Sequence, residues 1–282
     1  MSARSTARIV SFPDGAPHVP ETRRPSIVSP LDPSRRIQAV LFDLDGTLYD
    51  QRRMRRTMAM ELLTLPLTRP FSAVKTWRGL SAYRHAQEAL RGTERAGQAG
   101  KAGRGTEGTE NAEIDAQLNL AAVRCGIPSA TLKPIVQEWM FRRPLKHMRA
   151  CRAAGVVQLL TFLADAGLEL GVLSDYPAQD KLAALGVDRF FPTVLCTTDP
   201  QIGAFKPDPR GFLEASRRWG IAPAEVLVVG DRLDADAAGA AAAGMPCVIV
   251  GRSVRAESAP EGVLVFSSLE RLYRVLVDDK RR

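Results

Sequence analysis

The chain has 282 residues, of which 45% are hydrophobic and 25% charged, a balance typical of folded proteins rather than of disordered or fibrous ones. Its net charge of +8 favours anionic ligands, but the arginines are scattered, without the concentrated basic stripe of a nucleic-acid interface, so nucleic acid is not expected as a partner. No apolar run approaches the roughly 20 residues that cross a bilayer, and no secretory leader is evident. A soluble, cytoplasmic protein with no membrane partner is therefore expected, and the sequence indicates no particular oligomeric state.

The first part of the chain predicts a tail, a strand and a helical insertion. Residues 1–36 hold six prolines among Ser, Arg and Thr, which predicts a disordered N-terminal tail. The apolar run 37–42 predicts a strand buried on both faces. Between residues 49 and 148 the pattern becomes helical, with segments near 52–64, 72–91, 111–125 and 130–141. This stretch predicts an inserted helical lobe, in which the glycine-rich residues 92–110 form a flexible loop.

From residue 149 onward strands and helices alternate. Strands are predicted near 168–173, 193–196, 226–229, 247–250 and 263–266, and helices near 156–166, 177–186, 209–219 and 234–243. Such alternation predicts the α/β fold class, with a doubly wound parallel sheet covered by helices on both faces. Residues 37–48 and 149–282 would form this core. The four cysteines stand far apart, without metal-ligand spacing, and are interpreted as buried apolar residues.

Polar residues follow several of these strands. Asp43-Leu44-Asp45-Gly46-Thr47 follows the first strand, Ser174-Asp175 the second, and Gly230 to Asp236 the strand near 226–229, while Lys206 lies in a loop between strands. Ligands of doubly wound sheets collect at the carboxyl ends of the strands, so these groups are expected to converge. A phosphate ester needs cations and donors around the transferring group. Crowded carboxylates would also require a hard cation such as Mg²⁺.

Taken in order, these motifs resemble those of the haloacid dehalogenase-like (HAD) hydrolase superfamily. Asp43 to Thr47 match DxDGT, Ser174 and Lys206 match the second and third motifs, and Gly230 to Asp236 match GDxxxxD. The resemblance covers most of residues 37–268. It implies a Rossmann-like core and a helical cap domain at residues 49–148, and a phosphatase that acts on a small phosphorylated metabolite through an aspartyl-phosphate.

The resemblance also implies a role for each matching residue. Asp43 would be the nucleophile, Asp45 the general acid and base, and Lys206 the group that balances charge on the nucleophile and the phosphoryl group. Thr47 would support the loop, and Ser174 would hydrogen-bond the phosphoryl oxygens.

Magnesium would be held by Asp43, Asp231 and the backbone carbonyl of Asp45. Asp236, favoured over Asp234 on spacing, would complete the metal site by orienting Lys206 or metal-bound water. Asp175 stands where many relatives have asparagine, which makes the charge beside the phosphate less favourable.

Substrate selection is expected to depend on basic residues near the two ends of the lobe. Arg52 and Arg56 share one side of a predicted helix, so one of them could reach a carboxylate or second phosphate on the substrate; Arg143 and His147 are similar candidates. Phosphoglycolate, sugar phosphates and nucleotides are all compatible. The alternatives are a phosphosugar mutase of the same family and a non-catalytic binding or regulatory protein.

Overall fold

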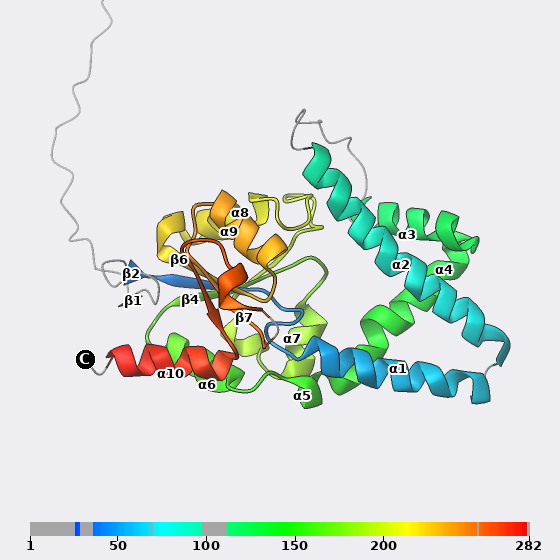
Figure 1. Ribbon diagram of the computed structural model, residues 1–282, viewed down its shortest axis with the longest axis horizontal. Coiled ribbons are helices and arrows are strands. Elements are labelled where there is room, and N and C mark those ends of the chain that lie inside the picture. The colour runs from blue at the N-terminus through cyan, green and yellow to red at the C-terminus, as the bar shows by residue number, and fades with distance from the viewer. Residues whose placement is uncertain (1–25, 29–35, 69, 98–111, 253, 281–282) are drawn as a thin grey trace, which may run out of the picture.

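The computed structural model describes residues 26–28, 36–68, 70–97, 112–252 and 254–280. A core of alternating strands and helices lies beside a separate lobe of long helices (Figure 1). None of the described helices combines the length and apolar character that a bilayer crossing requires.

Six parallel strands form the central sheet, in the order β5-β4-β3-β6-β7-β8. They are β3 (Ala39–Phe42), β4 (Glu169–Ser174), β5 (Thr193–Cys196), β6 (Val226–Gly230), β7 (Cys247–Val250) and β8 (Val263–Phe266). The two central strands, β3 and β6, pair from Ala39–Val226 to Phe42–Val229. Because the two strands are parallel and end at paired residues, the residues that follow β3 and β6 lie side by side at one edge of the sheet.

Helices cover both faces of the sheet, as the sequence predicted. Along β3, Val40 and Phe42 pack into the core on one face of the sheet, beneath α6 (Val156–Asp165) and α10 (Leu269–Lys280). Ala39 and Leu41 pack into the core on the other face, beneath α8 (Arg210–Trp219) and α9 (Ala238–Ala242). Figure 1 shows these two helical layers on opposite sides of the strands. The core helices are α6 (Val156–Asp165), α7 (Gln179–Leu185), α8 (Arg210–Trp219), α9 (Ala238–Ala242) and α10 (Leu269–Lys280). The doubly wound fold is confirmed, and α10 was not predicted.

Short helical turns connect several of these elements: η3 (Asp188–Phe190), η4 (Pro223–Glu225), η5 (Leu233–Ala237) and η6 (Ala256–Ser258). The helix predicted near 234–243 begins as the π-helical turn η5 and continues as α9. All four cysteines are buried and unpaired.

The lobe lies between β3 and β4 in the sequence. Its elements are α1 (Gln51–Thr68), α2 (Pro70–Gly97), α3 (Ala112–Cys125), α4 (Ser129–Val136), η1 (Gln137–Arg142), η2 (Arg143–His147) and α5 (Met148–Cys151). Tyr83, Ala86, Ala121 and Leu132 are buried in a small core of its own. The prediction of a flexible loop at 92–110 is wrong for its first residues, because α2 continues to Gly97; residues 98–110 lie outside the described part of the chain.

The two chain crossings between core and lobe are joined to each other. The amide of Asp50 donates to the carbonyl of Cys151 at 2.8 Å, and the amide of Ala153 donates to the carbonyl of Leu48 at 3.0 Å. Tyr49 and Arg152 form an antiparallel bridge between them. These bonds place the base of the lobe directly after the Asp43 loop.

A short strand pair precedes the core. Strand β1 (Ile27–Val28) pairs antiparallel with β2 (Arg36–Ile37). The expected disordered tail of residues 1–36 is therefore wrong for Ile27, Val28 and Arg36, because backbone pairing orders them; residues 1–25 and 29–35 lie outside the described part of the chain.

Gly155 permits a close approach between α6 and α10. It precedes α6 with φ of +80°, and an added Cβ would lie 2.5 Å from the Cα of Glu270. We expect Gly155→Ala to lower the free energy of unfolding by about 2–5 kcal/mol, through left-handed strain and overlap with backbone. Urea denaturation measures this change.

Gly262→Ala is the matched control, because Gly262 has φ of +79° and no atom within 4 Å of an added Cβ. It should lose only the strain, about 1–2 kcal/mol. Equal losses in the two variants would contradict a steric role for Gly155.

Candidate active site

Asp43 lies where the two central strands end. Its amide donates to the carbonyl of Val229 at 2.8 Å, which extends the pairing of β3 with β6 and fixes the position of the side chain. The carboxylate is nearly buried and accepts two hydrogen bonds, from Thr47 Oγ1 to Oδ2 at 3.0 Å and from Lys206 Nζ to Oδ1 at 2.5 Å. Thr47 thus ties the end of the loop back to its first residue.

Lys206 is the buried cation at the centre of the site. Its ammonium donates to Asp43 Oδ1, to Asp236 Oδ1 at 2.7 Å and to the carbonyl of Leu173 at 3.1 Å. Burial alone would lower the pKa of this amine, but the carboxylates of Asp236 and Asp43 outweigh burial and raise the pKa above its usual value. Lys206 therefore stays charged at neutral pH.

Asp236 closes the loop that follows β6. While Oδ1 accepts from Lys206, Oδ2 accepts from the backbone amides of Asp231 and Arg232, both at 3.1 Å. Asp234 instead pairs with the Arg232 guanidinium at 2.7 Å, near the surface. Asp236 rather than Asp234 thus lies beside Asp43, which is the arrangement favoured on spacing.

The carboxylates of Asp43, Asp231 and Asp236 meet closely enough to hold one cation. One oxygen from each lies within 4.8 Å of the other two. Burial, followed by the charge of Asp236, raises the pKa of Asp231 to about 7, and burial raises the pKa of Asp43 despite the nearby Lys206. When ionised, these groups and Lys206 leave two formal negative charges. A divalent, oxygen-seeking ion such as Mg²⁺ fits this donor set.

Gly46 makes room for that cluster. It has φ of +109°, and an added Cβ would lie 2.1 Å from Asp231 Oδ2. A side chain at this position would displace the Asp231 carboxylate, which gives a physical reason for glycine within the DxDGT motif.

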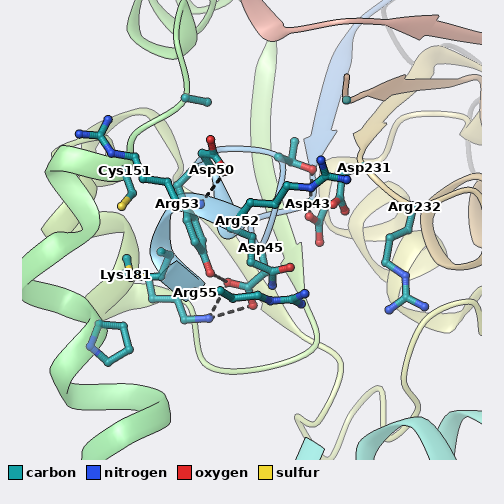
Figure 2. Close-up of a pocket in the computed structure, with 18 of the residues that line it drawn as sticks. Asp43, Asp45, Asp50, Arg52, Arg53, Arg55, Cys151, Lys181, Asp231 and Arg232 are labelled. Atoms are coloured by element: carbon teal, nitrogen blue, oxygen red, sulfur yellow. Dashed lines mark hydrogen bonds and ion pairs between the residues drawn. The ribbon is translucent and has the colours of Figure 1, made fainter. Parts of the chain in front are cut away.

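Asp45 lies in a different electrostatic environment. Lys181 Nζ donates to both of its oxygens, at 2.7 and 2.8 Å, and the Tyr49 hydroxyl donates to Oδ1 at 2.6 Å (Figure 2). Burial acts to raise the pKa of Asp45, but Lys181 outweighs it and the net pKa is lowered. Lys181 and Tyr49 were both missed from sequence. Tyr49 lies only four residues from Asp45, whereas nothing local distinguishes Lys181 from other helix lysines.

Ser174 and Asp175, at the end of β4, make hydrogen bonds next to the site. Asp175 Oδ1 accepts from the backbone amide of Lys206 and from Thr197 Oγ1, both at 3.2 Å. The charge of Asp175 also raises the pKa of Lys206. Ser174 Oγ accepts from the amide of Tyr176 at 3.3 Å. The unfavourable charge expected at Asp175 is thus used to hold the Lys206 loop.

A cavity of about 960 Å³ opens above these groups, between core and lobe, and its lining includes Asp43, Asp45, Lys206 and Asp231. Arg52 also lines this cavity, as a substrate-binding residue should. Several basic residues not singled out from sequence line it as well: Arg53, Arg55, Arg84, Arg152, Arg232 and Arg252.

The other three specificity candidates do not line the cavity. Arg143 lies over the Trp139 ring and pairs with Glu138 at 2.9 Å, and His147 Nε2 lies 2.5 Å from Glu61 Oε1. Arg56 is exposed on α1. Of Arg52 and Arg56, one of which was expected to reach the substrate, only Arg52 lines the cavity, and Arg143 and His147 lie outside its lining. Helical spacing alone does not reveal which side of α1 or η2 faces the core.

Comparison with known proteins agrees with this geometry. Residues 37–244 match the family described as haloacid dehalogenase-like hydrolase. The chain belongs to this family. It is 31% identical to glyceraldehyde 3-phosphate phosphatase of Methanopyrus kandleri, over 77% of this chain and 84% of that protein. It is 28% identical to phosphoglycolate phosphatase of Thiobacillus denitrificans, over 76% of this chain and 84% of the relative.

Solved structures show the same fold. A 2-haloacid dehalogenase from Pseudomonas syringae superposes with a TM-score of 0.57 at 23% identity, covering 86% of this chain and 99% of the other. A HAD-hydrolase from Bacillus subtilis gives 0.59 at 20% identity, covering 86% and 100%. Family membership and the phosphatase relatives identify this HAD-like protein as a phosphoric monoester hydrolase.

The buried position of Lys206 predicts a large loss of stability when its charge is removed. We expect Lys206→Met to lower the free energy of unfolding by about 3–5 kcal/mol without added metal, because Asp43 and Asp236 lose a buried partner. Urea denaturation measures this loss.

Lys146→Met is the control, because Lys146 pairs with Glu61 at 2.7 Å on the surface, with its side chain 55% exposed. It should change stability by less than about 1 kcal/mol. Similar losses in the two variants would show that the Lys206 pairs contribute no more than a surface pair.

Proposed function

We propose that the protein is a Mg²⁺-dependent phosphatase that forms an aspartyl-phosphate on Asp43. The observation that carries this proposal is the Asp43 carboxylate at the cavity floor, in contact with Lys206 and next to Asp231. The phosphatase names of relatives that match over most of the chain favour hydrolysis over the phosphosugar mutase and the non-catalytic alternatives.

Asp43 is the nucleophile of the first half-reaction. One of its oxygens bonds to phosphorus, the bond from phosphorus to the ester oxygen breaks, and Asp45, whose pKa the charge of the bound phosphate would raise, gives its proton to the leaving alcohol. Lys206 fixes the orientation of Asp43 through Oδ1, and Thr47 does so through Oδ2. Ser174 lies at the end of β4, where its hydroxyl would donate to a phosphoryl oxygen.

The second half-reaction restores the enzyme. Asp45, now a carboxylate, takes a proton from water as that water attacks phosphorus, and phosphate leaves Asp43. Lys181 and Tyr49 stabilise the carboxylate form of Asp45, which is the form that acts as base. Mg²⁺, held by Asp43, Asp231 and the Asp45 carbonyl, would neutralise charge on the phosphoryl oxygens. Asp236 would orient Lys206 and the loop that carries Asp231.

Replacing the nucleophile should abolish turnover. We expect Asp43→Asn to lower kcat/KM for p-nitrophenyl phosphate by about a thousandfold or more, because the amide is a poor nucleophile. Circular dichroism should show an intact fold. Asp165→Asn, an exposed change of the same kind on α6, should keep wild-type activity. Turnover retained by Asp43→Asn would refute the assignment.

Magnesium should stabilise the protein through the carboxylates of Asp43 and Asp231. A ligand at 100 times its Kd adds about 2.7 kcal/mol, which for a chain of this size raises Tm by several degrees. We expect this shift in differential scanning calorimetry and its loss in Asp231→Asn, and we expect chelator to stop turnover. An equal shift in Asp231→Asn, or activity in excess chelator, would contradict the metal assignment.

A further inference from the structure

The lobe side of the cavity carries positive charge that the protein does not neutralise. Arg52, Arg53 and Arg55 on α1 and Arg84 on α2 all line the cavity. Within the described part of the chain, none of these four guanidinium groups lies within ion-pair distance of a carboxylate.

Three of the core-side cations, by contrast, pair with carboxylates. Lys206 contacts Asp43 and Asp236, and Lys181 contacts Asp45. Arg232 pairs with Asp234 and approaches Glu88 of α2 at 4.0 Å. Of the other core-side arginines in the lining, Arg152 donates to the carbonyl of Leu185, and Arg252 has no carboxylate within ion-pair distance among the described residues. Most of the unneutralised charge, four arginines against two, therefore lies on the lobe wall.

Arg55 and Arg84 line the same cavity from two helices that pack together, α1 and α2. Partial removal from water and, next in size, the charge of Arg55 lower the pKa of Arg84. Figure 2 shows Arg52 and Arg55 extending from α1 toward the side of the cavity that holds Asp43 and Asp231. Two like charges that share one wall are unfavourable without an anion between them. Guanidinium groups bind carboxylate and phosphate through paired N–H donors.

We infer that Arg55 and Arg84 bind a second anionic group of the substrate, a carboxylate or a further phosphate, while the ester phosphate lies at Asp43. This inference rests on the proposed phosphatase function and narrows its substrate class. The ester phosphate would already be bound by Lys206 and by the cation that the site carboxylates would hold. It therefore does not need the lobe arginines. A cavity of about 960 Å³ has room for a substrate that spans both sites.

Pairs of ligands that differ in one anionic group test this inference. Phosphoglycolate and ethyl phosphate differ by a carboxylate, and propane-1,3-diol bisphosphate and propyl phosphate differ by a phosphate. Each is measured as an inhibitor of p-nitrophenyl phosphate hydrolysis in Mg²⁺, so the result does not require that the ligand itself is turned over. We expect the member with the second anionic group to bind about tenfold tighter or more in at least one pair. The pair that shows the difference identifies the anion.

Variants of the two arginines then locate the site. Arg55→Met and Arg84→Met should each reduce that preference about tenfold, and the Lys variants should keep part of it, because charge remains while the paired donors are lost. Arg56→Met is the matched control, since Arg56 lies on the same helix outside the cavity lining, and it should keep the preference.

The possible failures are distinguishable. Absence of any Mg²⁺-dependent phosphate release would overturn the proposed function and this inference with it. Hydrolysis of p-nitrophenyl phosphate without a preference in either pair would overturn only the inference. A preference that survives in both Arg55→Met and Arg84→Met would overturn it as well, by placing the anion elsewhere.

Discussion

The site depends on one buried ammonium group. Lys206 joins three strands of the sheet at their carboxyl ends: it contacts Asp43 after β3, the carbonyl of Leu173 in β4, and Asp236 in the loop after β6. Without it, the carboxylates would repel one another in a region with little water. With it, they stay close but not fully neutralised, and the remaining negative charge suits a divalent cation. The contacts of Lys206 therefore both join the ends of the three strands and fix the positions of the carboxylates of the site.

Two carboxylates of one short motif are placed in opposite environments. Burial raises the pKa of Asp43, whereas Lys181 lowers the pKa of Asp45. Without a bound cation these directions oppose the proposed roles, because Asp43 must be ionised to attack and Asp45 protonated to act as an acid. A divalent cation beside Asp43 would lower the first pKa, and the negative charge of a bound phosphate beside Asp45 would raise the second. Tyr49, which also contacts Asp45, lies in the hydrogen-bonded crossing between core and lobe. The position of Asp45, the proposed acid–base residue, is thereby linked to the junction between core and lobe.

Charge in the lobe is divided between its surfaces. Glu61 gathers Arg143, Lys146 and His147, all from the returning segment of the chain, into one cluster outside the cavity lining. This cluster joins α1 to η2, and within it the carboxylate of Glu61 is paired with basic groups outside the cavity lining. The cavity wall keeps Arg52, Arg55 and Arg84 without such partners among the described residues. A wall of this kind selects anions by charge, which is consistent with the overall excess of basic residues in the chain.

The alternation of strands and helices, the helical lobe and the residues at the strand ends could be predicted from the sequence, because they depend on local periodicity and short spacings. Asp43, Lys206, Asp231 and Asp236 could be named because parallel strands bring their carboxyl ends to one edge. Helix α10 and strand β1 were missed, since α10 is ordered by packing against α6 and β1 by pairing with β2.

Only the tertiary structure decided the strand order, the pairing of Lys181 with Asp45 across 136 residues, and which arginines face the cavity. Each of these depends on how distant segments pack and rotate against one another. A helix pattern gives the spacing of Arg52, Arg55 and Arg56 around the axis. The direction in which each one points is set by the buried contacts of α1, and these involve residues far away in the chain.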